Sequence, residues 1–166
     1  GVFNLAANTI NRSVAGGTIT VANGATLSIG GTNGFPSGYS TVSLGVPSST
    51  VNYSGSSQTV RALSYGHLVL SGSGTKTMPN TLFTVSGNFT TSGTNSATAA
   101  SSIQVTGNVE IGSGTTFNAS SYPHTVGGSW TVGGNFIPAT GSIEFNGSNA
   151  ANIGASSFRA TGRGRT

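Results

Sequence analysis

Carboxylates and imidazoles are the side chains of this sequence that could carry acid–base or metal chemistry, and they are few. The 166 residues include two glutamates, Glu110 and Glu144, two histidines, His67 and His124, and neither aspartate nor cysteine. Acid–base cleavage of a glycosidic bond needs two carboxyl groups that flank it. The glutamates are 34 residues apart, and each lies between two apolar residues of an alternating stretch. We therefore expect both on solvent-facing strand positions, on different faces.

Metal and phosphate sites are equally poorly supported. A structural zinc site needs four ligands, and two histidines without cysteine cannot supply them; we expect each histidine at a turn or strand start. Calcium-binding nonapeptide repeats require aspartate. Gly-rich runs such as Gly127-Gly128 lack the helix and lysine of a phosphate loop. We predict no catalytic, cofactor-binding or metal-binding residues, and hence no enzyme and no cofactor.

Charge is scarce. Six basic and two acidic residues make up 5% of the chain, against about 25% in ordinary globular proteins. The pI near 10.2 reflects a net charge of only +4, and the cations cluster only in a C-terminal tail, at Arg159, Arg163 and Arg165. Nucleic-acid binding needs a dense basic surface, so it is not expected. No stretch approaches the ~18 apolar residues of a membrane-spanning helix.

Short alternating stretches indicate an all-β fold. Two apolar residues at i and i+2 flank one small or polar residue, which places both on one face of a strand. The pairs are Ile19/Val21, Leu27/Ile29, Val42/Leu44, Val51/Tyr53, Leu68/Leu70, Phe83/Val85, Ile103/Val105, Val109/Ile111, Trp130/Val132 and Ile143/Phe145. Glycine follows most of these pairs, as in tight corners.

A repeated motif favours a solenoid. Val-x-Gly-Asn/Ser-apolar begins at Val85, at Val105 20 residues later and at Val126 after another 21; a further copy at Val132 breaks this spacing. A second echo links 50–56 with 142–148, 92 residues apart. A period near 20 predicts a parallel β-helix of roughly eight coils. A β-sandwich stays open as the alternative, because it also uses short alternating strands.

Two asparagines fall in step by this count. Asn88 and Asn108 could stack as an amide ladder inside a turn, each side chain bonded to the next. They could equally be ordinary turn residues. Inward positions would stack Val on Val and Phe on Trp along the axis of the solenoid.

The segments 17–30 and 105–118 resemble the Gly/Ser/Thr-rich repeats of large bacterial surface proteins, the autotransporter-like and filamentous-haemagglutinin-like adhesins. The resemblance covers residues 17–153. It implies a right-handed parallel β-helix, export to the cell surface or medium, and a role in adhesion or surface architecture, with no catalytic residues. We expect an N-terminal strand or cap over 1–16, solenoid repeats over 17–157 and a basic tail or linker over 158–166.

The leading functional expectation is a structural or adhesive module that forms a homo-oligomer or homopolymer through end-to-end β contacts. A solenoid ends in open β edges, which are templates for another chain. Val2, Phe3 and Leu5 are the candidate contact strand, supplied to a neighbour by β-augmentation.

The alternative is a surface that binds polysaccharide or ice. Thr18-Ile19-Thr20 and Thr75-Lys76-Thr77 are isolated in the sequence, so no threonine rank is expected. Tyr39, Tyr65 and Tyr122 could stack on sugars or plug corners of the fold.

Overall fold

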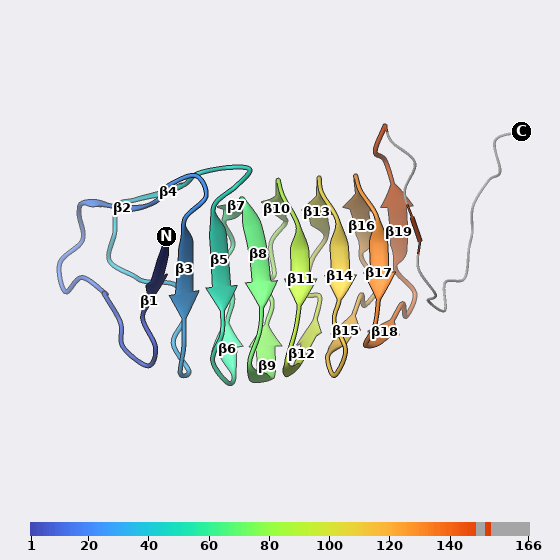
Figure 1. Ribbon diagram of the computed structural model, residues 1–166, viewed down its shortest axis with the longest axis horizontal. Helices are drawn as coiled ribbons and strands as arrows, with labels where there is room; N and C mark the ends of the chain where they lie inside the picture. The colour runs from blue at the N-terminus through green and yellow to red at the C-terminus, as the bar shows by residue number, and fades with distance from the viewer. Residues whose placement is uncertain (149–151, 154–166) are drawn as a thin grey trace, which may run out of the picture.

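The computed structural model describes residues 1–148 and 152–153, and their regular structure is entirely β. Four parallel sheets make up the molecule (Figure 1). Sheet 1 consists of β1 (Val2–Asn4), β3 (Thr26–Ile29), β5 (Thr50–Tyr53), β8 (His67–Leu70), β11 (Phe89–Thr91), β14 (Val109–Ile111) and β17 (Trp130–Val132). Sheet 2 consists of β7 (Ser64–Tyr65), β10 (Phe83–Val85), β13 (Ile103–Val105), β16 (Pro123–Val126) and β19 (Ser142–Phe145).

The other two sheets complete the coils. Sheet 3 consists of β6 (Gln58–Thr59), β9 (Ser73–Thr77), β12 (Thr94–Thr98), β15 (Thr116–Asn118) and β18 (Asn135–Ile137). Sheet 4 is the pair β2 (Thr18–Val21) and β4 (Thr41–Leu44). From β5 onward, the chain visits sheets 1, 3 and 2 in turn and then returns to sheet 1 one strand further along.

This path is a β-solenoid of about seven turns, which confirms the predicted solenoid, although roughly eight coils were expected, and excludes the β-sandwich. Leu27, Val51, Leu68, Phe89, Val109 and Trp130 occupy one column of sheet 1, so successive coils contain 24, 17, 21, 20 and 21 residues. The seven strands of sheet 1 stand side by side along the long axis in Figure 1. An isolated parallel bridge from Trp130 to Ile153 follows the last of them.

The alternating apolar pairs form the core, as the period of two requires. Each predicted pair lies in a strand with its two side chains turned inward, and those of the central coils are fully buried. Val85, Val105 and Val126 stack in register across sheet 2. Phe117 stacks on Phe136 at 6.3 Å between ring centroids, and Trp130 meets Phe136 edge-on at 4.9 Å.

The Val-x-Gly-Asn/Ser motif is a corner. Its valine ends a strand of sheet 2, its glycine turns the chain, and its last apolar residue begins a strand of sheet 1. The copy at Val132 breaks the spacing because it turns another corner, from β17 of sheet 1 into β18 of sheet 3. The echo between 50–56 and 142–148 is not a repeat of the solenoid, since β5 belongs to sheet 1 and β19 to sheet 2.

The first coils differ from the rest. β1 pairs with β3 and so belongs to sheet 1, while β2 and β4 form their own small sheet beside it. The predicted tail 158–166 lies outside the described residues. The described residues contain no helix, and therefore none long and apolar enough to cross a membrane.

Candidate functional site

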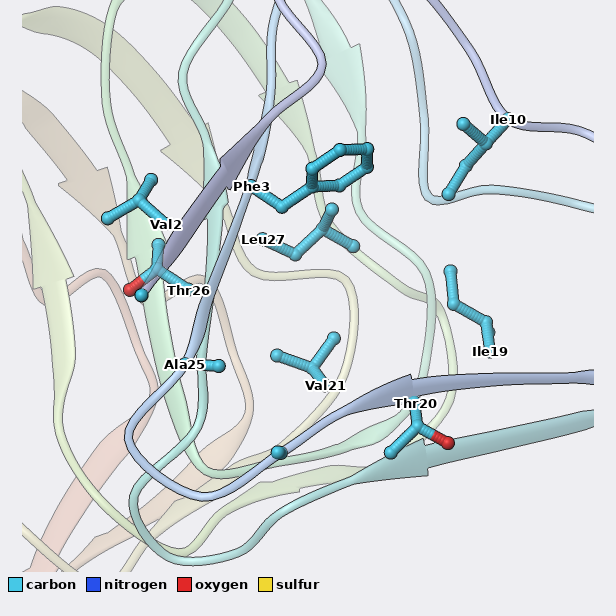
Figure 2. Close-up of a pocket in the computed structure, with 11 residues that line it drawn as sticks. Val2, Phe3, Ile10, Ile19, Thr20, Val21, Ala25, Thr26 and Leu27 are labelled. Atoms are coloured by element: carbon cyan, nitrogen blue, oxygen red, sulfur yellow. The ribbon is translucent and has the colours of Figure 1, made fainter.

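An apolar hollow of about 470 Å³ opens at the N-terminal end of the solenoid. Figure 2 shows Phe3 and Leu27 on one side of it and Ile10, Ile19 and Val21 on the other. The alternation in β2 turns Ile19 and Val21 toward the interior, and β3 does the same with Leu27. The hollow is thus the uncovered interior of the first coil, where another coil would bury apolar surface.

β1 forms the rim of this hollow and the outer edge of sheet 1. Val2 and Phe3 are 73% and 58% exposed, while Leu5 is 5% exposed and packs in the core of its own chain. One edge of β1 pairs in parallel with β3, and no strand of the described residues pairs along its other edge. Of the three residues in the expected contact strand, Val2 and Phe3 are therefore exposed at the end of the solenoid, Phe3 toward the hollow, and Leu5 is not.

A ladder of side chains runs along the corner between sheets 2 and 1. Nδ1 of His67 accepts a hydrogen bond from the backbone N–H of Asn88 at 2.9 Å. Oδ1 of Asn88 accepts from the N–H of Asn108 at 3.0 Å, and Oδ1 of Asn108 from the N–H of Ser129 at 2.8 Å. Asn88 and Asn108 are in step, as predicted, but each side chain bonds the next backbone rather than the next amide. Both lie on the outer side of the corner, not inside a turn.

The glycine of each motif makes room for this ladder. A Cβ atom on Gly107 would lie 2.5 Å from Oδ1 of Asn88 and 2.5 Å from the carbonyl oxygen of Gly87. A Cβ atom on Gly87 would lie 2.5 Å from Nδ1 of His67. Glycine is required here by the close approach of successive coils, and not by a positive φ.

Lys76, the only lysine, is buried inside the solenoid. Its ammonium group donates to the carbonyl oxygens of Gly55 and Ser56, both at 2.8 Å, and to Oε1 of Gln58 at 2.7 Å. Burial without a carboxylate partner lowers the pKa of Lys76 to about 8. Gln58 is buried as well, and its Nε2 donates to the carbonyl oxygens of Ile29 and Asn33. No local pattern in the sequence indicates this polar interior.

The predicted titratable residues do not converge. Glu110 is exposed on β14 of sheet 1 and Glu144 on β19 of sheet 2, so the expectation of different faces is confirmed. His67 begins β8, as predicted. No three His, Asp or Glu side chains come together in the described part of the chain.

His124 lies near the start of β16, as predicted, but its ring points into the core, 3% exposed. Its Nδ1 accepts from the N–H of Ile103 at 3.1 Å, and its Nε2 lies 2.9 Å from the carbonyl oxygen of Ala119. The ring is therefore neutral with its proton on Nε2, the nitrogen that donates to Ala119. Burial lowers the pKa of His124, and the hydrogen bond to Ala119 offsets part of that shift.

The outer face of sheet 3 corrects the expectation that no threonine rank forms. Thr75 pairs with Ser96, Ser96 with Thr116, and Thr116 with Asn135. A second rank lies two residues further along each strand: Thr59, Thr77, Thr98, Asn118 and Ile137. No charged side chain lies in either rank. The β-pairing brings together short stretches that are far apart in sequence.

The outer face of sheet 2 carries two adjoining hollows of about 400 and 670 Å³. Tyr122 lines the smaller one. Of the other two tyrosines considered for sugar stacking, Tyr65 is fully buried and cannot do so. Tyr39 is half-buried, and its hydroxyl donates to the carbonyl oxygen of Ile10 at 2.7 Å.

Comparison with known proteins gives no match: neither a protein-family model, nor a curated protein, nor a solved structure is significantly similar to this chain.

Proposed function

We propose that this chain is a non-enzymatic structural module whose coils extend end to end with those of a second copy. The observation that carries the proposal is the combination of an exposed strand edge, β1, with the apolar hollow beside it. Exposed Val2 and Phe3 would be covered by a further coil. The occupant we propose is the C-terminal end of another molecule of the same chain.

The parallel ladder supports this head-to-tail arrangement. In a parallel sheet the two edges differ, and the edge beyond the last strand is the natural complement of the edge before the first. Sheet 1 runs from β1 at one end to β17 and the bridge to Ile153 at the other. Contacts of this heterologous kind do not close on themselves and build a filament. The scarcity of charge reduces repulsion between copies.

The setting we propose is a bacterial surface fibre or a secreted adhesin. The Gly/Ser/Thr-rich repeats, the absence of cysteine and the neutral hydroxyl-rich surface support it. Each coil of a solenoid packs only against its neighbours, so added coils lengthen the molecule without changing the fold. This property suits a spacer or stalk.

The test is electron microscopy and light scattering of the purified chain over a range of concentrations, with the double variant Val2→Asp/Phe3→Asp. Wild type should form filaments, whose subunit rise would equal the length of the stacked coils. The double variant should remain monomeric, because two buried carboxylates would face an apolar contact. Leu82→Asp is the matched control, since Leu82 is 55% exposed but lies midway along the solenoid.

Filaments from the Leu82 variant but not from the double variant would support the end-to-end contact. Monomeric wild-type protein at every concentration would overturn self-assembly. Filaments from the double variant would show that the contact lies elsewhere.

A second candidate function, binding to ice, is favoured by the ranks on sheet 3. Neighbouring strands are about 4.7–4.9 Å apart and alternate residues about 6.6–6.8 Å apart, so the threonine and serine hydroxyls form a regular array, with Asn118, Asn135 and Ile137 at its C-terminal end. Wild type should alter the habit of growing ice crystals, and Thr98→Tyr, which interrupts one rank, should weaken the effect. The control is Thr131→Tyr on sheet 1. An unchanged crystal habit with wild type would exclude this function.

A further inference from the structure

We propose that the outer face of sheet 2 is a binding groove for an uncharged polysaccharide, centred on Gln104 and Thr125. These two residues line both of the adjoining hollows. They are also register partners on neighbouring strands, β13 and β16. The two hollows therefore meet at one side-chain pair and form one shallow groove that follows the strands.

The two ends of the groove are lined by side chains of different kinds. Leu82, Ser102, Tyr122 and Pro123 line it near the starts of the strands. Beyond the strand ends it is lined by Thr106, Gly127, Asn146 and Ser148. Glu144 occupies the same rank as Gln104 and Thr125, on the next strand, β19, and is exposed. An extended ligand would thus meet an apolar end, an amide at the centre and an amide at the far end.

The polar side chains of this face are free to bind. Gln104 and Thr125 make no side-chain hydrogen bond to another residue in the described ranges, 1–148 and 152–153. On the outer face of sheet 1 and at the corner beside it, by contrast, Asn52 accepts from Ser71, and Asn88 and Asn108 serve the ladder. Unengaged amides and hydroxyls both donate and accept, as sugar hydroxyls do.

Apolar surface at one end of the groove fits the faces of sugar rings. Leu82 is 55% exposed, Pro123 is exposed, and Tyr122 is half-buried with its ring packed against the core. Tyr122 thus offers an amphipathic ring held in place from below. A few oriented polar groups beside such surface are typical of small-molecule and sugar sites.

Other ligand classes fit less well. Nucleic acids and anionic polymers need cations, and the described cations lie elsewhere: Arg12 contacts Tyr39, Arg61 contacts Phe35, and Lys76 is interior. A peptide that binds by β-augmentation needs a strand edge. Gln104 and Thr125 lie on the face of a sheet, on strands that are paired along both edges. What remains is an uncharged chain of hydroxyl groups.

The test is affinity electrophoresis of the purified chain in gels that contain dextran, laminarin, xyloglucan or galactomannan, with heparin as the anionic comparison. At least one neutral polysaccharide should retard wild type. Gln104→Ala removes the central amide, and Thr125→Arg fills the meeting point of the two hollows. Both positions are solvent-facing, so both variants should fold, and each should weaken retardation at least tenfold. Thr131→Ala, solvent-facing on sheet 1, is the matched control.

Retardation by a neutral polysaccharide that is lost in both variants and kept in the control would support the groove. Absence of retardation by all four neutral polysaccharides would overturn it. So would retardation that is unchanged in the Gln104 and Thr125 variants, or retardation by heparin alone that disappears at high salt.

This inference is independent of end-to-end assembly. Filaments without polysaccharide binding would leave the proposed function standing and remove the groove. Binding by a chain that stays monomeric would do the reverse.

Discussion

The ammonium group of Lys76 donates a hydrogen bond to Oε1 of Gln58, 2.7 Å away in the preceding coil of the solenoid interior. Both side chains are buried, in adjacent strands of sheet 3. Three neutral oxygen atoms surround the charge, and the two glutamates of the chain lie on other sheets. A buried cation held only by neutral oxygens makes stability depend on pH.

The free energy of unfolding of the wild type should rise at alkaline pH because of Lys76, and Lys76→Met should abolish this rise. In the folded chain the pKa of Lys76 is lowered from 10.5 to about 8. Between these values the unfolded chain binds more protons, so the free energy of unfolding of wild type should rise with pH, by at most about 1.4 kcal/mol per pH unit. Urea unfolding near neutral pH and at about pH 9.5 measures this rise. The Met variant should lack it; an equal rise in both proteins would contradict the assignment.

Acid should weaken the fold through His124. Its folded pKa is lowered by burial, so below the ordinary value of about 6.5 the unfolded chain takes up a proton that the folded chain refuses. The free energy of unfolding should therefore fall as pH drops below that value. His124→Phe should be less stable near neutral pH but should lose less on acidification. A wild type whose melting temperature is the same near neutral pH and at about pH 5 would refute this.

Replacing the corner glycine should lower the free energy of unfolding more than removing one hydrogen bond of the ladder. Gly107→Ala would drive Cβ against a backbone carbonyl and an asparagine side chain, both at 2.5 Å, and should cost about 1–3 kcal/mol. Asn108→Ala removes one solvent-accessible hydrogen bond, to the N–H of Ser129, and should cost about 0.5–1.5 kcal/mol. Gly133→Ala is the control, because its Cβ would lie 3.5 Å from the nearest atom. Chemical denaturation ranks the three; a cost for Gly133→Ala as large as that for Gly107→Ala would contradict the steric argument.

The buried tyrosine pair should be sensitive to loss of one oxygen. The Tyr65 hydroxyl donates to the carbonyl oxygen of Arg61, so the Tyr53 hydroxyl, 3.1 Å away, must donate to Tyr65. Tyr65→Phe would remove the acceptor of the Tyr53 hydroxyl proton and the donor to the Arg61 carbonyl oxygen, while Tyr53 would still accept from the N–H of Arg61; the change should cost about 1–3 kcal/mol. Tyr122→Phe serves as the comparison and should change the free energy of unfolding little. Equal costs for the two variants would argue against the ordered pair.

Ten strands could be predicted from alternating apolar pairs in the sequence, but none of them belongs to sheet 3. Pairs such as Val109/Ile111 indicate strands because two apolar residues share the inward face. Strands of sheet 3 turn only one or two side chains inward, and in β9 the buried one is Lys76. A lysine between two threonines is indistinguishable in sequence from a solvent-facing residue. Its burial depends on carbonyl oxygens of the preceding coil, which no local pattern specifies.

The candidate sites were only partly predictable for the same reason. Phe3 at an open end follows from the solenoid period and its apolar neighbours. The groove on sheet 2 does not, because Gln104 and Thr125 are 21 residues apart and become partners only through the register of β13 and β16. The threonine ranks were likewise hidden, since coil lengths of 17 to 24 residues obscure which short stretches align.

The three central coils of 21, 20 and 21 residues share one corner and one ladder. Each receives a hydrogen bond from the coil after it and gives one to the coil before it, so any of them presents the same two surfaces to its neighbours. Removing or duplicating one such unit would leave both ends of the molecule chemically unchanged. The length of the solenoid can therefore change in steps of one strand spacing, about 4.8 Å, when a stretch of about 20 codons is copied or lost.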